Sequence, residues 1–346
     1  MAASGQARDN RTAPRAILKF LSFFVSRLGK AVFVVLGVIV FNFFLIRMAP
    51  GDPASVMAGE AASADPAYVE QLRRQFGFDL PIYDQLWLYL KGILQLDLGF
   101  SYRNKLPVID LIVERLPATL LLMGCAFVFS LVVGVLLGVV ASRARYTERK
   151  TWVDSAIMSG ALLVYATPLF WLSLLMIILF SVMLGWLPAF GMESVGANLT
   201  GWARVTDIAA HLVLPVVSLG CFFMAVYARL TRASMLEVMG MDFIKTARAK
   251  GVPANQVIRR HVLRNALLPV VTFAGIQLGQ MAGGAVLTET VFAWPGIGRL
   301  MFDALLQRDY QLLLGVFLIT AVMVVVFNLA TDLVYRLIDP RIEFGS

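Results

Sequence analysis

Residues 117–140 read PATLLLMGCAFVFSLVVGVLLGVV and contain no charged side chain. A helix rises about 1.5 Å per residue, so about 20 apolar residues cross the roughly 30 Å hydrocarbon core of a bilayer. This run is therefore long enough to cross a membrane. Five more apolar runs follow the same pattern, at Leu28–Met48, Ile157–Leu184, Leu212–Leu230, Leu267–Thr290 and Leu312–Leu337. The chain is predicted to be an all-α polytopic membrane protein with six transmembrane helices.

The composition of the whole chain supports this prediction. Of the 346 residues, 59% are hydrophobic and 15% are charged, and the mean hydropathy is +0.77. Soluble domains are about 45–50% apolar and about 25% charged. Both cysteines, Cys125 and Cys221, fall within apolar runs. Neither a disulfide framework nor a metal site is therefore predicted.

Basic residues set the expected orientation, because Lys and Arg are enriched on the cytoplasmic side of membrane proteins. We counted them in the segments between runs, together with the basic residues at adjoining run ends. The segments before the first run, between the second and third, between the fourth and fifth, and after the sixth hold 20, against nine in the others when Arg47, within the first run, is left out. Both termini are therefore expected in the cytoplasm. This topology accounts for the net charge of +8 without a nucleic-acid partner.

The runs also divide the chain into segments. Residues 1–27 form an N-terminal segment in which Ala13–Leu28 is amphipathic, either lying in the inner membrane interface or extending the first helix. Residues 28–48 form the first helix, and residues 49–116 form an outer cap. Residues 117–337 form the membrane core, which contains an inner loop at residues 231–266. Residues 338–346 form a cytoplasmic tail. In the cap, helices are expected over Tyr68–Phe76 and after Pro81. The second should rest on the membrane rim or on a partner through an apolar stripe of Ile82, Leu86, Leu90 and Leu94.

The inner loop has the pattern of an exposed helix. Residues 231–269 read TRASMLEVMGMDFIKTARAKGVPANQVIRRHVLRNALLP. Apolar residues recur there at helical spacing, at Met235, Leu236, Met239, Phe243 and Ala247. Gly251 and Pro253 should end this helix. A helix that docks into a groove of a partner is favoured, with packing on its own chain, or a basic face against anionic lipid, as alternatives.

At this loop the chain resembles the permease subunits of ATP-binding-cassette importers, in the dipeptide, oligopeptide and nickel branch. In that family the last large cytoplasmic loop carries a Glu-Ala-Ala triplet, a three-residue gap and a Gly, and its helix inserts into the ATPase. Residues 245–247 match the triplet and Gly251 matches the glycine. The glutamate is absent, and the closing Leu-Pro comes late, at Leu268 and Pro269. Both departures match the peptide branch.

Further motifs extend the resemblance over nearly the whole chain after residue 28. They are APGDP at 49–53, DLGFSYR at 97–103, ERLPATL at 114–120, GGAVLTETVFAWPGIGRL at 283–300, RDY at 308–310 and DPRI at 339–342. The DLGFSYR motif suggests no chemistry by itself. The resemblance implies the core of a type I importer permease made of the second to sixth helices, with the first helix peripheral. The ATPase-coupling residues that it implies are Met239, Gly240, Asp242, Phe243, Lys245, Thr246, Ala247, Arg248, Lys250 and Gly251.

The resemblance also implies partners and a location. The partners are a second, similar permease from a different gene, two cytoplasmic ATPases, a periplasmic solute-binding protein and membrane lipid, in a bacterial inner membrane. Peptides are the favoured solute, while nickel chelates, glutathione, opines and oligosaccharides stay open. The sequence contains no G-x-x-x-x-G-K-[ST] phosphate loop. The chain is therefore expected not to be an enzyme and to bind no cofactor, with ATP and Mg held by the ATPases.

Polar residues within apolar runs are costly in lipid and are candidates for a solute path. On the fifth run they are Gln277, Gln280, Thr288 and Glu289. Glu289 either lines an outer gate or is a helix-end carboxylate that is hydrated or paired with Arg299. On the sixth run, Asp332 should pair with Arg336 or face a partner. A proton relay through Glu289 and Asp332 would instead make the chain an ion-coupled secondary transporter, and a scaffold without solute flux is a third class.

Small residues and prolines indicate how the helices pack. Three glycines lie four residues apart on the fifth run, namely Gly275, Gly279 and Gly283. Such spacing lets helices approach closely, either between two permeases or within one subunit. Pro168 and Pro215 should bend the third and fourth helices, and Pro269 should mark the first turn of the fifth.

Overall fold

The computed structural model describes residues 12–48, 53–58, 65–75, 77–146 and 150–338. The side chains before Val25 and the predicted Asp332–Arg336 pair lie outside this description, as does the DPRI motif. The N-terminal stretch forms one continuous helix with the first run, α1 (Thr12–Arg47), which agrees with the alternative that it extends that helix.

Five helical stretches of the described chain are long and apolar enough to cross a membrane. They are α1, α6 (Val108–Tyr146), α9 (Gly201–Met239), the stretch of α11, η2 and α12 (Ala254–Val291), and α14 (Tyr310–Ile338). A sixth crossing is broken, because α7 (Thr151–Ala166) meets the stretch of α8 (Leu169–Met176) and the π-helical η1 (Ile177–Met183) at 104°. The prediction of an all-α protein with six apolar crossings is confirmed when this bent pair is taken as one.

Proline chemistry explains the broken crossing. Pro168 has no backbone N–H, and its ring disfavours helical geometry at the preceding residue. Thr167 accordingly adopts extended backbone angles and ends α7. The bend expected at Pro168 is therefore confirmed, whereas Pro215 lies inside the continuous helix α9.

The expected role of Pro269 was wrong. Pro269 lies inside α12 (Leu263–Val291), and helix already begins at Ala254 in α11 (Ala254–Val257), followed by the π-helical η2 (Ile258–Val262). Apolar residues of these earlier turns, including Val257 and Val262, are fully buried in one cluster. Their packing keeps the chain helical ahead of the proline.

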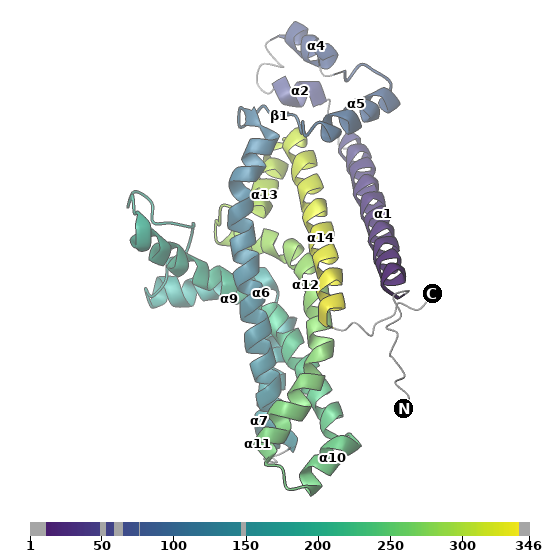
Figure 1. Cartoon of the computed structure of the whole chain (residues 1–346). Coiled ribbons are helices and arrows are strands. Elements are labelled where there is room, and N and C mark those ends of the chain that lie inside the picture. Colours follow the sequence, from purple (N-terminus) through teal and green to yellow (C-terminus); the bar gives the residue numbers. More distant parts are fainter. Residues whose placement is uncertain (1–11, 49–52, 59–64, 76, 147–149, 339–346) are drawn as a thin grey trace.

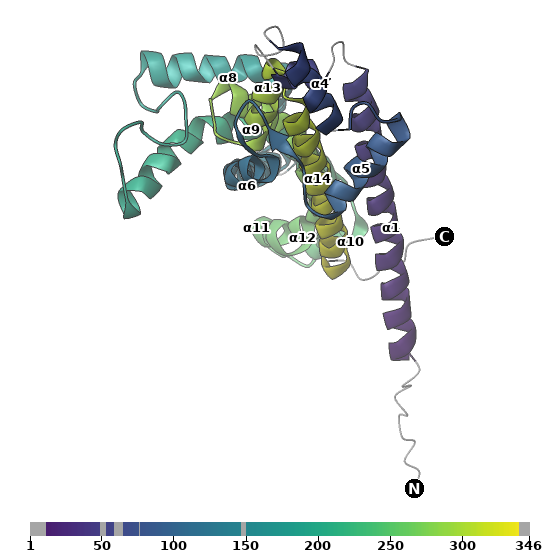
Figure 2. The same cartoon turned by 90° about the horizontal axis from the view of Figure 1, so that it is seen from above.

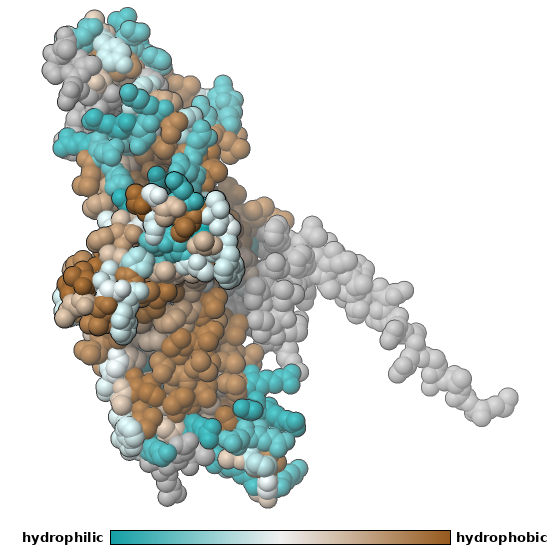
Figure 3. Space-filling view, turned by 90° about the vertical axis from the view of Figure 1, so that its left-hand side faces the viewer, coloured by the Kyte–Doolittle hydropathy of each residue, from teal (hydrophilic) through white to brown (hydrophobic). Residues whose placement is uncertain are grey.

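The helices form a bundle whose centre is the contact between α6 and α9 (Figure 1). Gly134 and Gly138 of α6 allow this approach, because a Cβ at Gly134 would lie 2.5 Å from Tyr227 Cβ and one at Gly138 2.5 Å from Thr231 Cβ. α12 packs against both α9 and α14, and α1 packs on α14 at the edge of the bundle. The side facing the viewer in Figure 3 shows a broad hydrophobic area between hydrophilic ends, as a lipid-embedded protein requires.

The glycines of α12 divide between two environments. A Cβ at Gly275 would collide with Thr331 of α14, and one at Gly279 would lie 3.2 Å from Asn328 Oδ1. These two glycines therefore serve packing within the subunit. A Cβ at Gly283 would meet no described atom within 4 Å, so this position is open to a neighbour.

The two ends of the bundle carry different elements (Figures 1 and 2). One end holds α2 (Pro53–Ala58), α4 (Pro66–Gln75), α5 (Ile82–Leu94) and a short antiparallel pair of β1 (Phe100–Ser101) and β2 (Leu106–Pro107). α10 (Asp242–Ala249) lies at the opposite end. Both helices predicted in the outer cap are present.

The apolar stripe predicted for α5 is half-buried at Leu86 and Leu90 and exposed at Ile82 and Leu94, so its contact with the membrane rim or with a partner stays a prediction. Residues spaced by four drift around a helix of 3.6 residues per turn. The face that packs on the bundle instead includes Tyr89, Leu90 and Ile93.

We expect the substitution Gly134→Ala to lower the stability of the protein. The added methyl would collide with Tyr227 Cβ and the Met224 carbonyl, and overpacking of this kind costs roughly 1–3 kcal/mol. Thermal unfolding of the purified chain in detergent measures the loss. Gly124→Ala is the matched control, because a Cβ at Gly124 of the same helix has no described neighbour within 4 Å. Equal unfolding temperatures for the two variants would contradict the close α6–α9 contact.

Candidate functional site

α10 is set off from the membrane helices by a defined start and a defined stop. Met241 is extended at its N-cap and separates it from α9. Asp242 occupies the first turn, where a carboxylate interacts favourably with the helix dipole. At the other end, Gly251 has a φ of +79°, a left-handed conformation that glycine adopts without strain. Gly251, the glycine of the family signature, therefore allows the backbone to turn at the end of α10.

α10 is fixed to its own chain by one buried side chain. Ile244 is fully buried in an apolar cluster with Met235, Met239, Val257 and Val262. The expectation that Met235 and Met239 form a docking face was therefore wrong, because both methionines lie on α9 and fill the space beneath α10. Packing within the chain therefore explains Met235 and Met239 in the helical pattern of the inner loop.

The opposite face of α10 is open. Most of the residues that the resemblance implies for coupling are exposed, namely Gly240, Asp242, Phe243, Lys245, Thr246, Arg248, Lys250 and Gly251, whereas Ala247 is half-buried. Met241 and Phe243 place two large apolar side chains on this surface. The Lys245 ammonium lies 2.8 Å from Asp242 and holds the pKa of that carboxyl below its usual range. The open face thus combines two apolar side chains with charges of both signs.

Tyr146 connects α10 to α6, a contact that no motif in the sequence predicts. The Arg248 guanidinium lies 4.8 Å from the centre of the Tyr146 ring, within the range of a cation–π interaction. The Tyr146 hydroxyl donates a 3.0 Å hydrogen bond to the carbonyl of Met239. The ends of α6 and α9 and the last turn of α10 therefore meet at one aromatic ring.

A buried carboxylate joins three membrane helices near the same end. Asp154 of α7 is 2% exposed and accepts two hydrogen bonds from Arg232 of α9, one of them 2.7 Å long. Arg145 of α6 donates a third, at 3.3 Å. This network was not predicted from the sequence. A signal for it was present, because Asp154 and Arg145 come before the third apolar run and Arg232 comes after the fourth.

Glu289 does not line a solute path within this subunit. Its side chain is fully buried and accepts hydrogen bonds from Thr119 Oγ1 at 2.7 Å and from the backbone N–H groups of Gly298 and Arg299 at 2.7 and 3.1 Å. Those N–H groups begin α13 (Ile297–Gln307), whose dipole favours a carboxylate there. The interpretation of Glu289 as a helix-end carboxylate is confirmed in part, because it lies in the last turn of α12 and contacts Arg299, although through the backbone N–H and not the guanidinium. The hypothesis of an outer gate finds no support within this subunit, because the side chain is fully buried.

Three other residues proposed for the path are also placed by the structure. Thr288 is buried, and Gln277 is 3% exposed and donates to Gln280 Oε1 at 3.2 Å. Gln280 is exposed. Of these three, only Gln280 can face a pathway shared with another subunit.

Two family motifs that are distant in the sequence meet in the fold. Ser101 of DLGFSYR is buried and donates a hydrogen bond from its hydroxyl to the carboxylate of Asp309 in RDY. Trp294 likewise donates from Nε1 to the carbonyl of Ala118, at 2.9 Å. These motifs therefore hold the end of the bundle that carries the cap.

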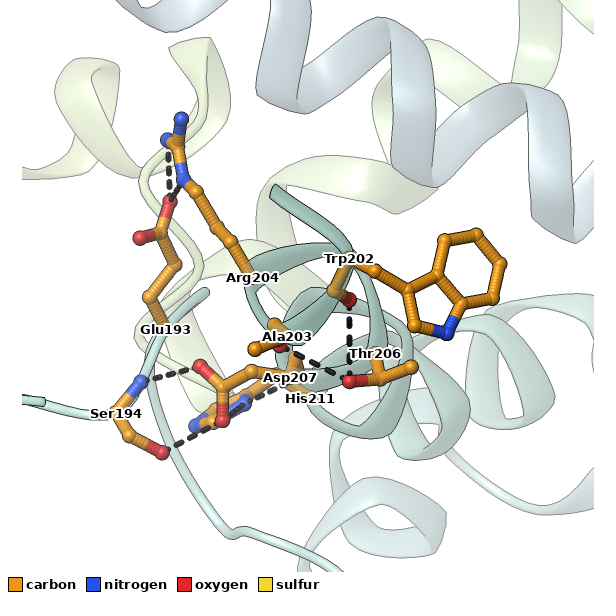
Figure 4. Close-up of polar contacts among 8 residues, drawn as sticks. All are labelled: Glu193, Ser194, Trp202, Ala203, Arg204, Thr206, Asp207 and His211. Atoms are coloured by element: carbon orange, nitrogen blue, oxygen red, sulfur yellow. Dashed lines mark hydrogen bonds and ion pairs between the residues drawn. The ribbon is translucent and has the colours of Figure 1, made fainter. Parts of the chain in front are cut away.

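A polar cluster closes the loop between η1 and α9 (Figure 4). Arg204 donates to Glu193 Oε1 at 2.6 Å and holds the pKa of Glu193 below its usual range. The Ser194 hydroxyl donates to Asp207, while His211 Nδ1 lies near the Asp207 carbonyl oxygen. A serine whose hydroxyl is bound by a carboxylate instead of a histidine is not an activated nucleophile. The hydrogen bonds of this cluster instead hold the loop against the start of α9, beside an open cavity of about 460 Å³.

Comparison with known families matches this architecture. Residues 130–344 match the model of the binding-protein-dependent transport system inner membrane component, and residues 20–123 match the model of its N-terminal part. The chain belongs to this family. The N-terminal match covers α1, the cap and the first turns of α6, and the boundary between the two matched segments falls within α6.

Relatives that cover nearly the whole chain are named as permeases of dipeptide transport systems. The dipeptide transport system permease protein of Escherichia coli K12 is 40% identical over 340 residues, covering 93% of this chain and 99% of the relative. The dipeptide permease of Alkalihalophilus pseudofirmus is 38% identical over 338 residues, covering 94% and 100%. An inward-facing structure of the MetNI methionine ABC transporter shares the fold, with a TM-score of 0.55, 20% identity, and coverage of 67% of this chain and 97% of that one.

We expect Glu289→Gln to destabilise the protein. A glutamine amide group would direct N–H donors toward Thr119 or the α13 N-terminus, which are themselves donors, and hydrogen bonds to charged groups contribute about 1.5–3 kcal/mol each. The melting temperature in detergent should fall. Glu237→Gln on the exposed surface of α9 is the control and should leave it unchanged. Normal melting together with altered solute selectivity would restore the gate hypothesis.

Proposed function

We propose that this chain is one of two permease subunits that enclose the membrane pathway of an ATP-driven importer of peptides. The observation that carries this proposal is α10, a short helix with an open face, fixed by Ile244 at the end of the bundle opposite the cap. Membership of the transport family and full-length relatives named as dipeptide permeases support the solute class.

The proposed orientation places α10 and both termini in the cytoplasm of a bacterium and the cap outside the inner membrane. The excess of Lys and Arg in the segments on the α10 side supports it. On that side the open face of α10, with Met241 and Phe243 exposed on it, would seat in a groove of a cytoplasmic ATPase. ATP and Mg would be bound by that partner.

The proposed mechanism is alternating access. When ATP draws two ATPases together, each would push the α10 seated in it. Ile244 would pass the displacement to the ends of α9 and α12, and Arg248 would pass it to α6 through Tyr146. Because Asp154 binds arginines from α6 and α9, α7 would move with them. The core of this subunit would then rock against the second permease and open outward.

The solute would come from an external binding protein that docks near the cap. It would enter between the two permeases, a location that suits the exposed Gln280 and the open surface at Gly283. ATP hydrolysis would return the inward-facing state. This scheme gives the chain no chemical step of its own.

We expect Phe243→Asp to abolish coupled uptake while the chain still inserts and melts normally. Phe243 is 44% exposed on α10, so a charge there should not disturb the subunit, but it would be buried unpaired in an ATPase groove. Co-purification of the ATPases with the chain and ATP-dependent peptide uptake into proteoliposomes are the measurements.

Tyr68→Asp is the matched control, because Tyr68 is an aromatic residue of similar exposure, 39%, on α4 at the other end of the molecule. It should leave ATPase binding intact. Wild-type ATPase binding and uptake by Phe243→Asp would contradict a docking role for α10.

A further inference from the structure

α5 carries a stripe of large apolar side chains that the bundle does not cover. Tyr83, Trp87 and Leu94 are 70%, 67% and 84% exposed. At 100° per residue these three positions fall on one side of the helix, and Lys91, also exposed, lies beside them. This stripe is distinct from the face of α5 that packs inward.

The inward face fixes the depth of α5 relative to α1. Arg47, at the last turn of α1, donates to Gln85 Oε1 from Nε and Nη2 at 3.0 and 2.8 Å. One turn deeper in α1, the Phe43 ring stacks on Tyr89 with 5.8 Å between centroids. Ile93 packs against a cluster that contains Ile39. α5 thus lies across the end of α1 (Figure 1).

These contacts place α5 beside the membrane-crossing part of α1. The apolar span of α1 covers Val25–Leu45, so Phe43 and Ile39 lie inside it. Because Tyr89 stacks on Phe43, α5 reaches the end of this span and does not lie beyond it. Its exposed side must therefore lie at the depth where the hydrocarbon meets the headgroups.

We infer that α5 is an in-plane membrane helix whose Tyr83–Trp87–Leu94 stripe contacts lipid. α1 also exposes apolar side chains near this end, where Phe41 and Leu45 are 65% and 48% exposed. Tyr and Trp are enriched at membrane interfaces, where the ring is apolar and its polar group reaches water. Lys91 can extend its ammonium from this position to lipid phosphates. The cap is thereby anchored to the bilayer as well as to α1.

Site-directed spin labelling of the full chain tests this inference. Cys125 and Cys221 are replaced by alanine, and single cysteines at Trp87 and at Leu94 carry a nitroxide in nanodiscs of phosphatidylethanolamine and phosphatidylglycerol. Power saturation measures collision with oxygen, which partitions into lipid, and with a water-soluble nickel chelate. Phe33→Cys, on the exposed side of α1, is the lipid reference. Gln71→Cys, exposed on α4, is the water reference.

The expected oxygen-to-nickel ratio at both positions is several-fold above that at Gln71 and close to that at Phe33. A ratio at Trp87 and Leu94 equal to that at Gln71 would overturn the inference, because the stripe would then face water. Low collision rates with both reagents would also overturn it, in favour of a protein neighbour. Tyr83→Cys supplies a third position if one label disturbs the helix. The test requires no transport activity, so its failure leaves the proposed function untouched.

Discussion

The burial of Ile244 is the interaction on which the functional reading of this protein depends. α10 can transmit the motion of a partner to the membrane helices only if it is fixed to them. Eight residues of helix are too few to be stable by themselves in water, and α10 is held by one isoleucine that fills a cluster built from α9, α11 and η2. The same packing that stabilises α10 leaves its other face free for a partner.

Polar contacts extend this rigid unit into the bundle. Tyr146 links α10 with α6 and α9, and Asp154 binds arginines of α6 and α9 from α7. Removing one member of such a buried ion pair leaves an uncompensated charge and costs about 3–5 kcal/mol. At the opposite end, Glu289 and Thr119 hold the start of α13 against α6 and α12. Buried polar groups at both ends thus fix helices whose lipid-facing surfaces offer no specificity of their own.

Much of the fold follows from one-dimensional properties of the sequence. The length of an apolar run decides whether it can cross a bilayer, and Pro168 decides where the third crossing breaks. The segment proposed for coupling was recognised by its signature, and the φ of Gly251 explains the glycine of that signature. Each of these features is determined by residues that lie close together in the sequence.

The errors concern residues whose role depends on distant segments. Glu289 resembled a pathway carboxylate because nothing in its run reveals that the N–H groups of Gly298 and Arg299 fold back onto it. Met239 looked like part of a docking face because helical periodicity alone does not show that α9 ends there and α10 turns back over it. Ser101 had no assigned role until the fold placed Asp309 beside it.

The central claim is that this subunit moves solute only when an ATPase drives it through α10. Uptake of a labelled dipeptide tests it directly, in proteoliposomes that contain the chain with its partner permease and binding protein, with and without the ATPases. The account predicts accumulation only when ATPases and ATP are both present, whatever proton or sodium gradient is imposed. Accumulation driven by an ion gradient without the ATPases would contradict it.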